Sequence, residues 1–191
     1  MPHPRLTFAC ELAPARLTAL FSDATVLADL QALGAHVALM LSDPSAERAA
    51  VVRRLTRAGI PVVAIPLVPV EEGYYFTADN APRAATRYDE WKAWTTQHGL
   101  VWEGVGLDIE PDARFYQQLM DNPWGLLPLL LPRLRDRERP RQAQAAYAAL
   151  VDRIHADGSR QPGSSHAGGG VHGGRSTWDR SDIHVPRSAQ P

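Results

Sequence analysis

HVALMLSD, residues 36–43, is the stretch that decides the fold class. Five apolar residues follow one another from Val37 to Leu41, without the alternation of a strand that has one face in water. Such a continuous apolar run is typical of a strand buried on both faces of a parallel sheet. PVVAIPLVP, residues 61–69, is a second run of this kind, although its prolines disfavour a central position in a sheet. Together the two runs predict an α/β protein with a parallel sheet.

Four predicted strands alternate with four predicted helices along the chain. The strands are expected over 6–12, 36–43, 61–69 and 102–111, and the helices, where apolar residues recur at helical spacing, over 14–34, 44–59, 81–99 and 139–158. Ser42 or Asp43 is expected to cap the second of these helices. This alternation predicts right-handed crossovers between parallel strands.

Polar side chains at the ends of the predicted strands favour a barrel over an open sheet. These side chains are Glu11, Asp43, Glu71, Asp108 and Glu110. In a barrel all strand ends of one kind meet at a single face, where active sites lie. No glycine-rich phosphate loop follows the first strand, which disfavours a nucleotide-binding sheet. A complete (β/α)₈ barrel needs at least about 200 residues. We therefore expect residues 1–158 to form a partial parallel (β/α) barrel of about four βα units.

The segment EGVGLDIE, residues 103–110, ends in two carboxylates. Because strand side chains alternate, Gly106, Asp108 and Glu110 share one face of the predicted strand, and the branched residues share the other. Side chains two residues apart lie roughly 6 to 7 Å from each other along a strand. At that spacing the more buried carboxyl can keep its proton near neutral pH. A protonated carboxyl beside an ionised one is what cleavage of a glycosidic bond requires.

The same segment resembles the strand-four signature of family 18 glycoside hydrolases, the chitinase-like barrels, whose pattern is D-G-x-D-x-D-x-E. Glu103 stands at the first Asp of that pattern, Gly104 matches, and Gly106 replaces the second Asp. Asp108 and Glu110 match the last two acidic positions. The D-x-E pair is also similar to that of family 25 lysozymes.

The resemblance implies a role for each carboxylate. Glu110 would be the general acid that protonates the leaving oxygen, and Asp108 would orient the acetamido group of the substrate, which acts as the nucleophile. Glu11 is expected on the same side as this catalytic pair, as a substrate-binding residue. Tyr74 and Tyr75, after the third predicted strand, are predicted either to stack on sugar rings or to belong to a packed loop, and Trp124, in DNPWG, is expected to line the substrate cleft or to pack in the core.

Other functions fit the same residues. Glu11, Asp108 and Glu110 at one barrel mouth would also hold a divalent metal, as in metal-dependent phosphodiesterases of this barrel type. A non-catalytic carbohydrate-binding or scaffold protein is a third interpretation, which the missing aspartate at Gly106 favours. The simplest interpretation is structural, with Asp108 and Glu110 capping a helix that starts near Pro111. A metal requirement, or sugar binding without turnover, distinguishes these possibilities.

The overall composition points to no charged polymer or membrane as a partner. The net charge is −1 over 191 residues, and no apolar run is long enough to span a bilayer. The start, MPHPRLTFACELAPARL, lacks the basic and apolar regions of a secretory signal, so a cytoplasmic location is expected. Cys10 is the only cysteine, which excludes an internal disulfide. We expect a carbohydrate or other small-molecule substrate, and neither a metal nor another cofactor.

The regular pattern stops after Gly158. Residues 159–191 are rich in Gly, Ser, Arg, Pro and His, a composition that predicts disorder. Lys92 is the only lysine, which indicates a GC-rich coding sequence, and the tail resembles an out-of-frame translation of such DNA. We hypothesise a frameshift or truncation near Gly158 that leaves half a barrel, which would self-associate through exposed sheet edges. The competing hypothesis is a native small α/β domain with a disordered tail.

Overall fold

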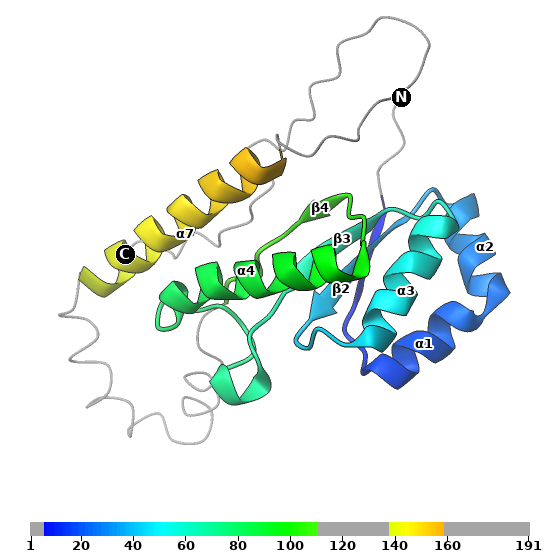
Figure 1. The fold of residues 1–191 in the computed structure, drawn as a ribbon, viewed down its shortest axis with the longest axis horizontal. Coiled ribbons are helices and arrows are strands. Elements are labelled where there is room, and N and C mark those ends of the chain that lie inside the picture. The colour runs from blue at the N-terminus through cyan, green and yellow to red at the C-terminus, as the bar shows by residue number, and fades with distance from the viewer. Residues whose placement is uncertain (1–5, 111–137, 159–191) are drawn as a thin grey trace, which may run out of the picture.

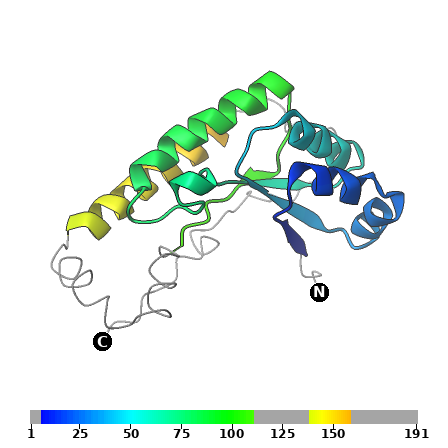
Figure 2. The ribbon, with the colours of Figure 1, turned by 90° about the horizontal axis from the view of Figure 1, so that it is seen from below.

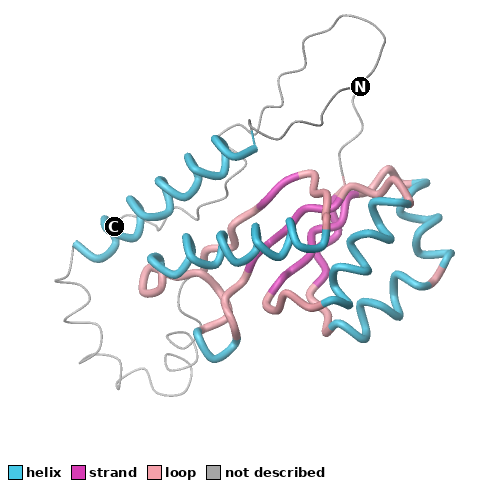
Figure 3. The backbone as a smooth tube through the Cα atoms, viewed as in Figure 1, coloured by secondary structure: helices cyan, strands magenta, loops and turns pink. Residues whose placement is uncertain are grey.

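A computed structural model describes residues 6–110 and 138–158, which form a four-stranded sheet with helices (Figure 1). The strands are β1 (Thr7–Cys10), β2 (His36–Leu41), β3 (Val62–Pro66) and β4 (Gly104–Val105). All neighbouring pairs are parallel, in the order β1-β2-β3-β4. Figure 3 shows the strands side by side. The predicted parallel α/β class is confirmed.

Five α-helices and one short 3₁₀ helix occur among the described residues. They are α1 (Pro14–Ser22), α2 (Ala24–Ala32), α3 (Ala46–Arg57), the 3₁₀ helix η1 (Val70–Glu72), α4 (Ala81–His98) and α7 (Glu138–Gly158). Within the same ranges, none of the helices has the length and apolar character needed to cross a membrane. The helices predicted over 44–59, 81–99 and 139–158 are confirmed within a few residues.

Two local predictions were wrong. The single helix predicted over 14–34 is divided at Asp23, whose extended backbone (φ −74°, ψ 119°) ends α1. Asp23 also begins α2, because its side chain accepts a hydrogen bond from the Thr25 amide at 2.8 Å. The cap of α3 is Ser45 instead of Ser42 or Asp43, since the Ser45 hydroxyl accepts from the Arg48 amide.

β3 accommodates its prolines at its boundaries. Pro61 precedes the strand, and Pro66 is its last residue. The missing amide of Pro66 is compensated at the next position, where the Leu67 amide donates to the Leu41 carbonyl at 3.0 Å. The strand therefore lies between β2 and β4 without an interrupted ladder.

The helices α1, α3 and α4 lie on one side of the sheet (Figure 2). Parallel strands in sequential order, joined by right-handed crossovers, place each connecting helix on the same face. Val37, Leu39 and Ala64 point to that face and belong to one buried cluster with side chains of these three helices. The opposite face carries Ala38 and Val63, which lie outside that cluster.

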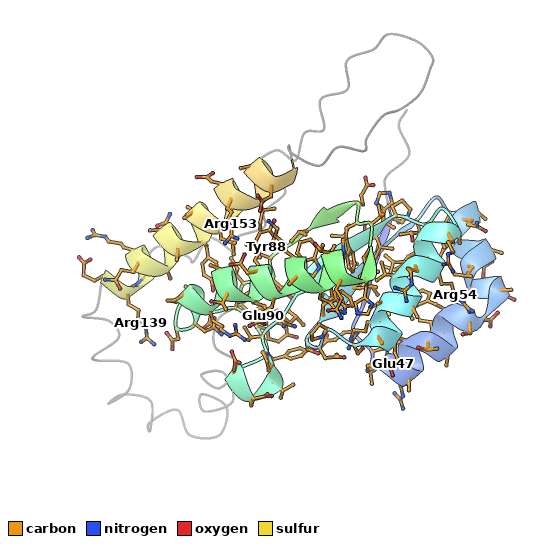
Figure 4. All side chains as sticks on the ribbon, viewed as in Figure 1. Glu47, Arg54, Tyr88, Glu90, Arg139 and Arg153 are labelled. Carbon is orange, nitrogen blue, oxygen red and sulfur yellow. The ribbon has the colours of Figure 1, made fainter. Side chains whose placement is uncertain are left out.

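The C-terminal helix α7 packs against α4 through paired charges and one aromatic ring. Figure 4 shows Tyr88 of α4 and Arg153 of α7 close together, and the guanidinium lies 5.4 Å from the ring centroid. Asp157 accepts from Lys92 at 2.7 Å and from the Tyr88 hydroxyl at 3.3 Å, and Arg153 also pairs with Asp89. These contacts hold α7 beside α4, the helix that precedes β4.

A buried arginine joins the carboxyl ends of β2 and β3. Arg87 of α4 is 5% exposed, and its Nε donates to the Leu67 carbonyl at 2.6 Å. Its Nη2 donates to the carbonyls of Leu41 and Ser42 at 3.1 and 3.0 Å, and its Nη1 pairs with Glu90 at 3.0 Å. One planar group therefore satisfies three main-chain acceptors where both strands end.

Replacement of Arg87 by Met should keep much of the side-chain volume while it removes every donor. The carbonyls of Ser42 and Leu67 then lose the guanidinium, so we expect the free energy of unfolding to fall by about 2–4 kcal/mol. Urea denaturation measures the change. Arg141→Met is the matched control, since Arg141 is 73% exposed and its ion pair with Glu138, at 3.6 Å, lies on the surface. Equal losses in the two variants would contradict the role of Arg87.

Candidate functional site

The predicted site residues come from three segments that meet at the carboxyl ends of the strands. Glu11 follows β1, Tyr74 and Tyr75 lie in the connection from β3 to α4, and Asp108 and Glu110 follow β4. Each of these residues interacts electrostatically with at least one from another segment. The structure therefore brings these five side chains together.

The segment that carries Asp108 and Glu110 is held at two places. The Gly106 amide donates to the Ala64 carbonyl of β3 at 2.8 Å. Further on, Ile109 forms a parallel bridge with Phe76, and the Glu110 amide donates to the Phe76 carbonyl at 2.8 Å. The strand predicted over 102–111 thus pairs first with β3 and then with the loop that follows it. Asp108 lies between the two attachments.

The two faces of this segment are occupied as the alternation predicts. Val105, Leu107 and Ile109 pack against the buried core. On the other face, a Cβ atom added at Gly106 would lie 2.6 Å from the Cδ1 atom of Ile65. Ile65 therefore fills the space beside Gly106. The carboxylate that the family pattern would place at this position has no room unless Ile65 moves.

Tyr74 and Tyr75 occupy a loop that is fixed from both sides. Their rings meet edge to face, with centroids 4.9 Å apart and an interplanar angle of 81°. Asn80, at the start of α4, donates from its side chain to the Tyr75 carbonyl at 2.9 Å. On the sheet side, the Val68 amide donates to the Tyr74 carbonyl at 3.1 Å. The two rings therefore have a defined position beside the carboxylates.

Burial and nearby negative charge raise the pKa of two carboxyl groups at this end of the sheet, Asp108 and Glu110. Burial raises the pKa of Asp108, and the negative charge of Glu11 raises it further. The pKa of Glu110 is raised by burial, then by Asp108 and by Glu11. Groups with such raised pKa values stabilise the fold while they are protonated, and this contribution is lost as the pH rises through the folded-state values.

Burial and the charge of Glu11 raise the pKa of both tyrosines. Burial raises the pKa of Tyr75, and Glu11, Glu110 and Asp108 each add to the effect. Burial also raises the pKa of Tyr74, followed by a side-chain hydrogen bond with Glu11. Both phenols therefore stay protonated at neutral pH and act as hydrogen-bond donors. Donors of this kind suit the oxygen-rich surface of a sugar.

Arg48 is a charged residue near the site that the sequence analysis missed. Its side chain is 5% exposed, and its Nε donates to an Asp43 carboxylate oxygen at 2.7 Å. Its Nη1 donates to the Met40 carbonyl at 3.2 Å. The positive charge lowers the pKa of both Cys10 and Tyr74, against the larger effect of burial. Arg48 therefore lies beside β1 and the tyrosine loop.

The sequence did contain a signal for Arg48. Arg48 stands three, four and seven positions before Val51, Val52 and Leu55, which are all buried. An arginine within the apolar stripe of a helix faces the core, where its charge needs a partner. The same pattern identifies Arg87, which shares its stripe on α4 with buried apolar and aromatic side chains.

Trp124 and the tail over 159–191 lie outside the described residues. Among residues 6–110 and 138–158, no group of three His, Cys, Asp or Glu side chains is arranged to hold a metal ion. The other two polar residues predicted at strand ends are placed differently. Glu71 lies in η1, and Asp43 forms an ion pair with Arg48.

Comparison of the chain with protein-family models, with curated proteins and with solved structures yields no match. Function must therefore be argued from the site itself.

Proposed function

We propose that this protein is a glycoside hydrolase-like protein that cleaves amino-sugar glycosides with Asp108 and Glu110. The observation that carries the proposal is the arrangement of these two carboxyls on one face at the carboxyl end of β4. Their raised pKa values support it, because a general acid has to hold its proton near the working pH.

The chemistry follows from the resemblance to chitinase-like enzymes. The carboxyl of Glu110, whose pKa is raised by burial and then by the charges of Asp108 and Glu11, donates its proton to the glycosidic oxygen as the bond to the anomeric carbon breaks. Asp108 in its ionised form orients the acetamido group, whose oxygen attacks the anomeric carbon. Water then opens this intermediate and returns a proton to Glu110. Tyr75, whose pKa is raised by burial and by the charges of the carboxylates, offers a ring and a hydroxyl to the sugar.

We also propose that the four-stranded sheet is half of a (β/α)₈-type barrel. Sequential strand order with helices on a single face is the winding of a barrel, whereas a doubly wound sheet reverses its order. The position of α7 against α4 supports this proposal, because α7 is the first helix after β4 among the described residues, and it packs beside the helix before β4. A half barrel leaves open edges, and Phe8 on β1 is 47% exposed.

The acid role predicts a specific loss of activity. Glu110→Gln should lower turnover of a fluorogenic N-acetylchitobioside at least about 100-fold, because general acid catalysis contributes roughly 10² to 10⁴. Glu71→Gln is the matched control, since it makes the same substitution at a glutamate in η1, which follows β3 and carries no proposed catalytic role. Unchanged turnover in Glu110→Gln would refute the acid assignment. Sugar binding without turnover in the unaltered chain would identify a carbohydrate-binding protein instead.

The half-barrel proposal predicts self-association through β1. Light scattering after size-exclusion chromatography should give at least a dimer for the unaltered chain. Phe8→Lys should shift it toward the monomer, because lysine on an edge strand opposes pairing. Val101→Lys is the control, since Val101 is 68% exposed but lies in the connection from α4 to β4, outside any strand. A monomer that unfolds cooperatively would contradict the half-barrel.

A further inference from the structure

The C-terminal helix α7 buries few of its side chains against the rest of the protein. Three of its 21 residues are buried, and these are Ala143, Tyr147 and Leu150. Ala146 and Ile154 are half-buried against the same core cluster. Because two of these five side chains are alanines, little apolar area leaves water when α7 docks. Apolar packing alone therefore holds α7 weakly.

Ion pairs hold α7 along its length. Figure 4 shows Arg139 and Arg153 toward opposite ends of the helix, and positions so far apart in sequence lie about 20 Å from each other along a helix axis. Among the described residues, three ion pairs join α7 to the rest of the chain, and they are Arg139 with Asp79, Arg153 with Asp89, and Asp157 with Lys92. These pairs restrain both the position and the direction of α7 on α4.

The same ion pairs are open to screening by dissolved salt. Their side chains are between 23% and 54% exposed, whereas the side chain of Arg87 at the strand ends is 6% exposed. Exposed charges interact less as ionic strength rises, because the Debye length falls from about 10 Å at 0.1 M to about 3 Å at 1 M. We therefore expect salt to weaken the docking of α7 more than it weakens the sheet.

One side chain of α7 reaches the residues that hold Glu110. The Tyr147 hydroxyl donates to the Thr77 carbonyl at 2.7 Å, and the centroid of its ring lies 6.4 Å from that of Phe76. Phe76 is fully buried, and its carbonyl accepts from the Glu110 amide at 2.8 Å. Phe76 also forms the parallel bridge with Ile109. A continuous series of contacts therefore runs from α7 to the carboxylate segment.

The other attachment of this segment lies within the sheet. The Gly106 amide donates to the Ala64 carbonyl of β3 at 2.8 Å, and Ala64 is fully buried. This hydrogen bond continues the ladder between β3 and β4, which pairs Ala64 with Val105. Departure of α7 should therefore loosen the segment at Glu110 and leave it attached at Gly106.

We propose that α7 is a reversibly docked helix that regulates the candidate site through Tyr147. While the ion pairs hold α7 on α4, Tyr147 supports Phe76, and the carboxylate segment is attached at two places. When α7 leaves, the attachment at Gly106 remains and Glu110 loses its fixed position. The inference rests on the proposed function for its catalytic meaning. Tyr147 is then a positioning residue that acts through Phe76.

Amide hydrogen exchange of the ¹⁵N-labelled full chain, followed by NMR, tests this inference. Between about 0.1 M and about 1 M sodium chloride, exchange of the Glu110 amide should accelerate relative to that of the Gly106 amide. Lys92→Gln combined with Arg153→Gln removes two of the three ion pairs. At about 0.1 M salt this double variant should accelerate Glu110 exchange roughly 2- to 30-fold, as expected for the loss of two exposed pairs. Added salt should then have a smaller effect than in the unaltered chain.

A third substitution tests the contact between α7 and the site. Tyr147→Phe keeps the ring beside Phe76 but removes the hydrogen bond to the Thr77 carbonyl, so exchange of the Glu110 amide should accelerate about 2- to 10-fold. The Gly106 amide should change little, because its hydrogen bond lies within the sheet. This difference between two amides of one segment separates positioning from a general loss of stability.

Arg141→Gln is the matched control for the charge variants. It also removes a positive charge from α7, but the ion pair of Arg141 is with Glu138 of the same helix, so Glu110 exchange should stay unchanged. The inference would be overturned by Glu110 exchange that responds neither to salt nor to the variants, or by equal acceleration at Gly106. Where a variant does not fold, the salt series on the unaltered chain decides between these outcomes.

The experiment distinguishes this inference from the proposed function, because hydrogen exchange requires no substrate. If exchange at Glu110 changes as expected but no amino-sugar glycoside is cleaved, the regulation by α7 stands and the proposed hydrolysis fails. If Glu110→Gln abolishes turnover but exchange at Glu110 is indifferent to salt and to the α7 variants, the hydrolysis stands and the regulation fails.

Discussion

The guanidinium of Arg87 is the constraint on which the arrangement of the strand ends depends. It donates hydrogen bonds to main-chain carbonyls at the ends of both β2 and β3, and it is almost completely buried. The chain leaves β3 at Leu67 to form the tyrosine loop, and it leaves β2 at Ser42 to reach Asp43 and α3. A single buried charge therefore fixes the starting points of two connections that surround the candidate site.

From this anchor the rest of the site is assembled in steps. Glu90 pairs with both Arg87 and Arg83. Arg83 also pairs with Glu72, and this ion pair holds η1 against α4. Beyond η1, Phe76 pairs with Ile109 and so holds the segment that follows β4. The helix α7 supports this bridge, because the Tyr147 hydroxyl donates to the Thr77 carbonyl at 2.7 Å. The carboxylates thus lie on a framework that includes β2, β3, η1, α4 and α7.

Sequence reasoning predicted the sheet because buried parallel strands have a simple signature, and HVALMLSD and PVVAIPLVP both became strands. It predicted the meeting of Glu11, Asp108 and Glu110 because parallel strands bring their carboxyl ends to one edge. It missed the break at Asp23, because helical spacing continues through a residue that can cap the next helix. It also missed the left-handed backbone of Tyr74, which hydrogen bonds with Pro69 and Val68 in the same turn hold in place.

The central claim is that three distant segments form one sugar-binding site. A titration of the ¹⁵N-labelled chain with an N-acetylglucosamine oligomer, followed by amide chemical shifts, tests it most directly. The account predicts that amides near Glu11, in the Tyr74–Tyr75 loop and from Gly106 to Glu110 shift together with a single affinity. Shifts confined to one segment or to the α4–α7 surface, or none at millimolar oligomer, would contradict it.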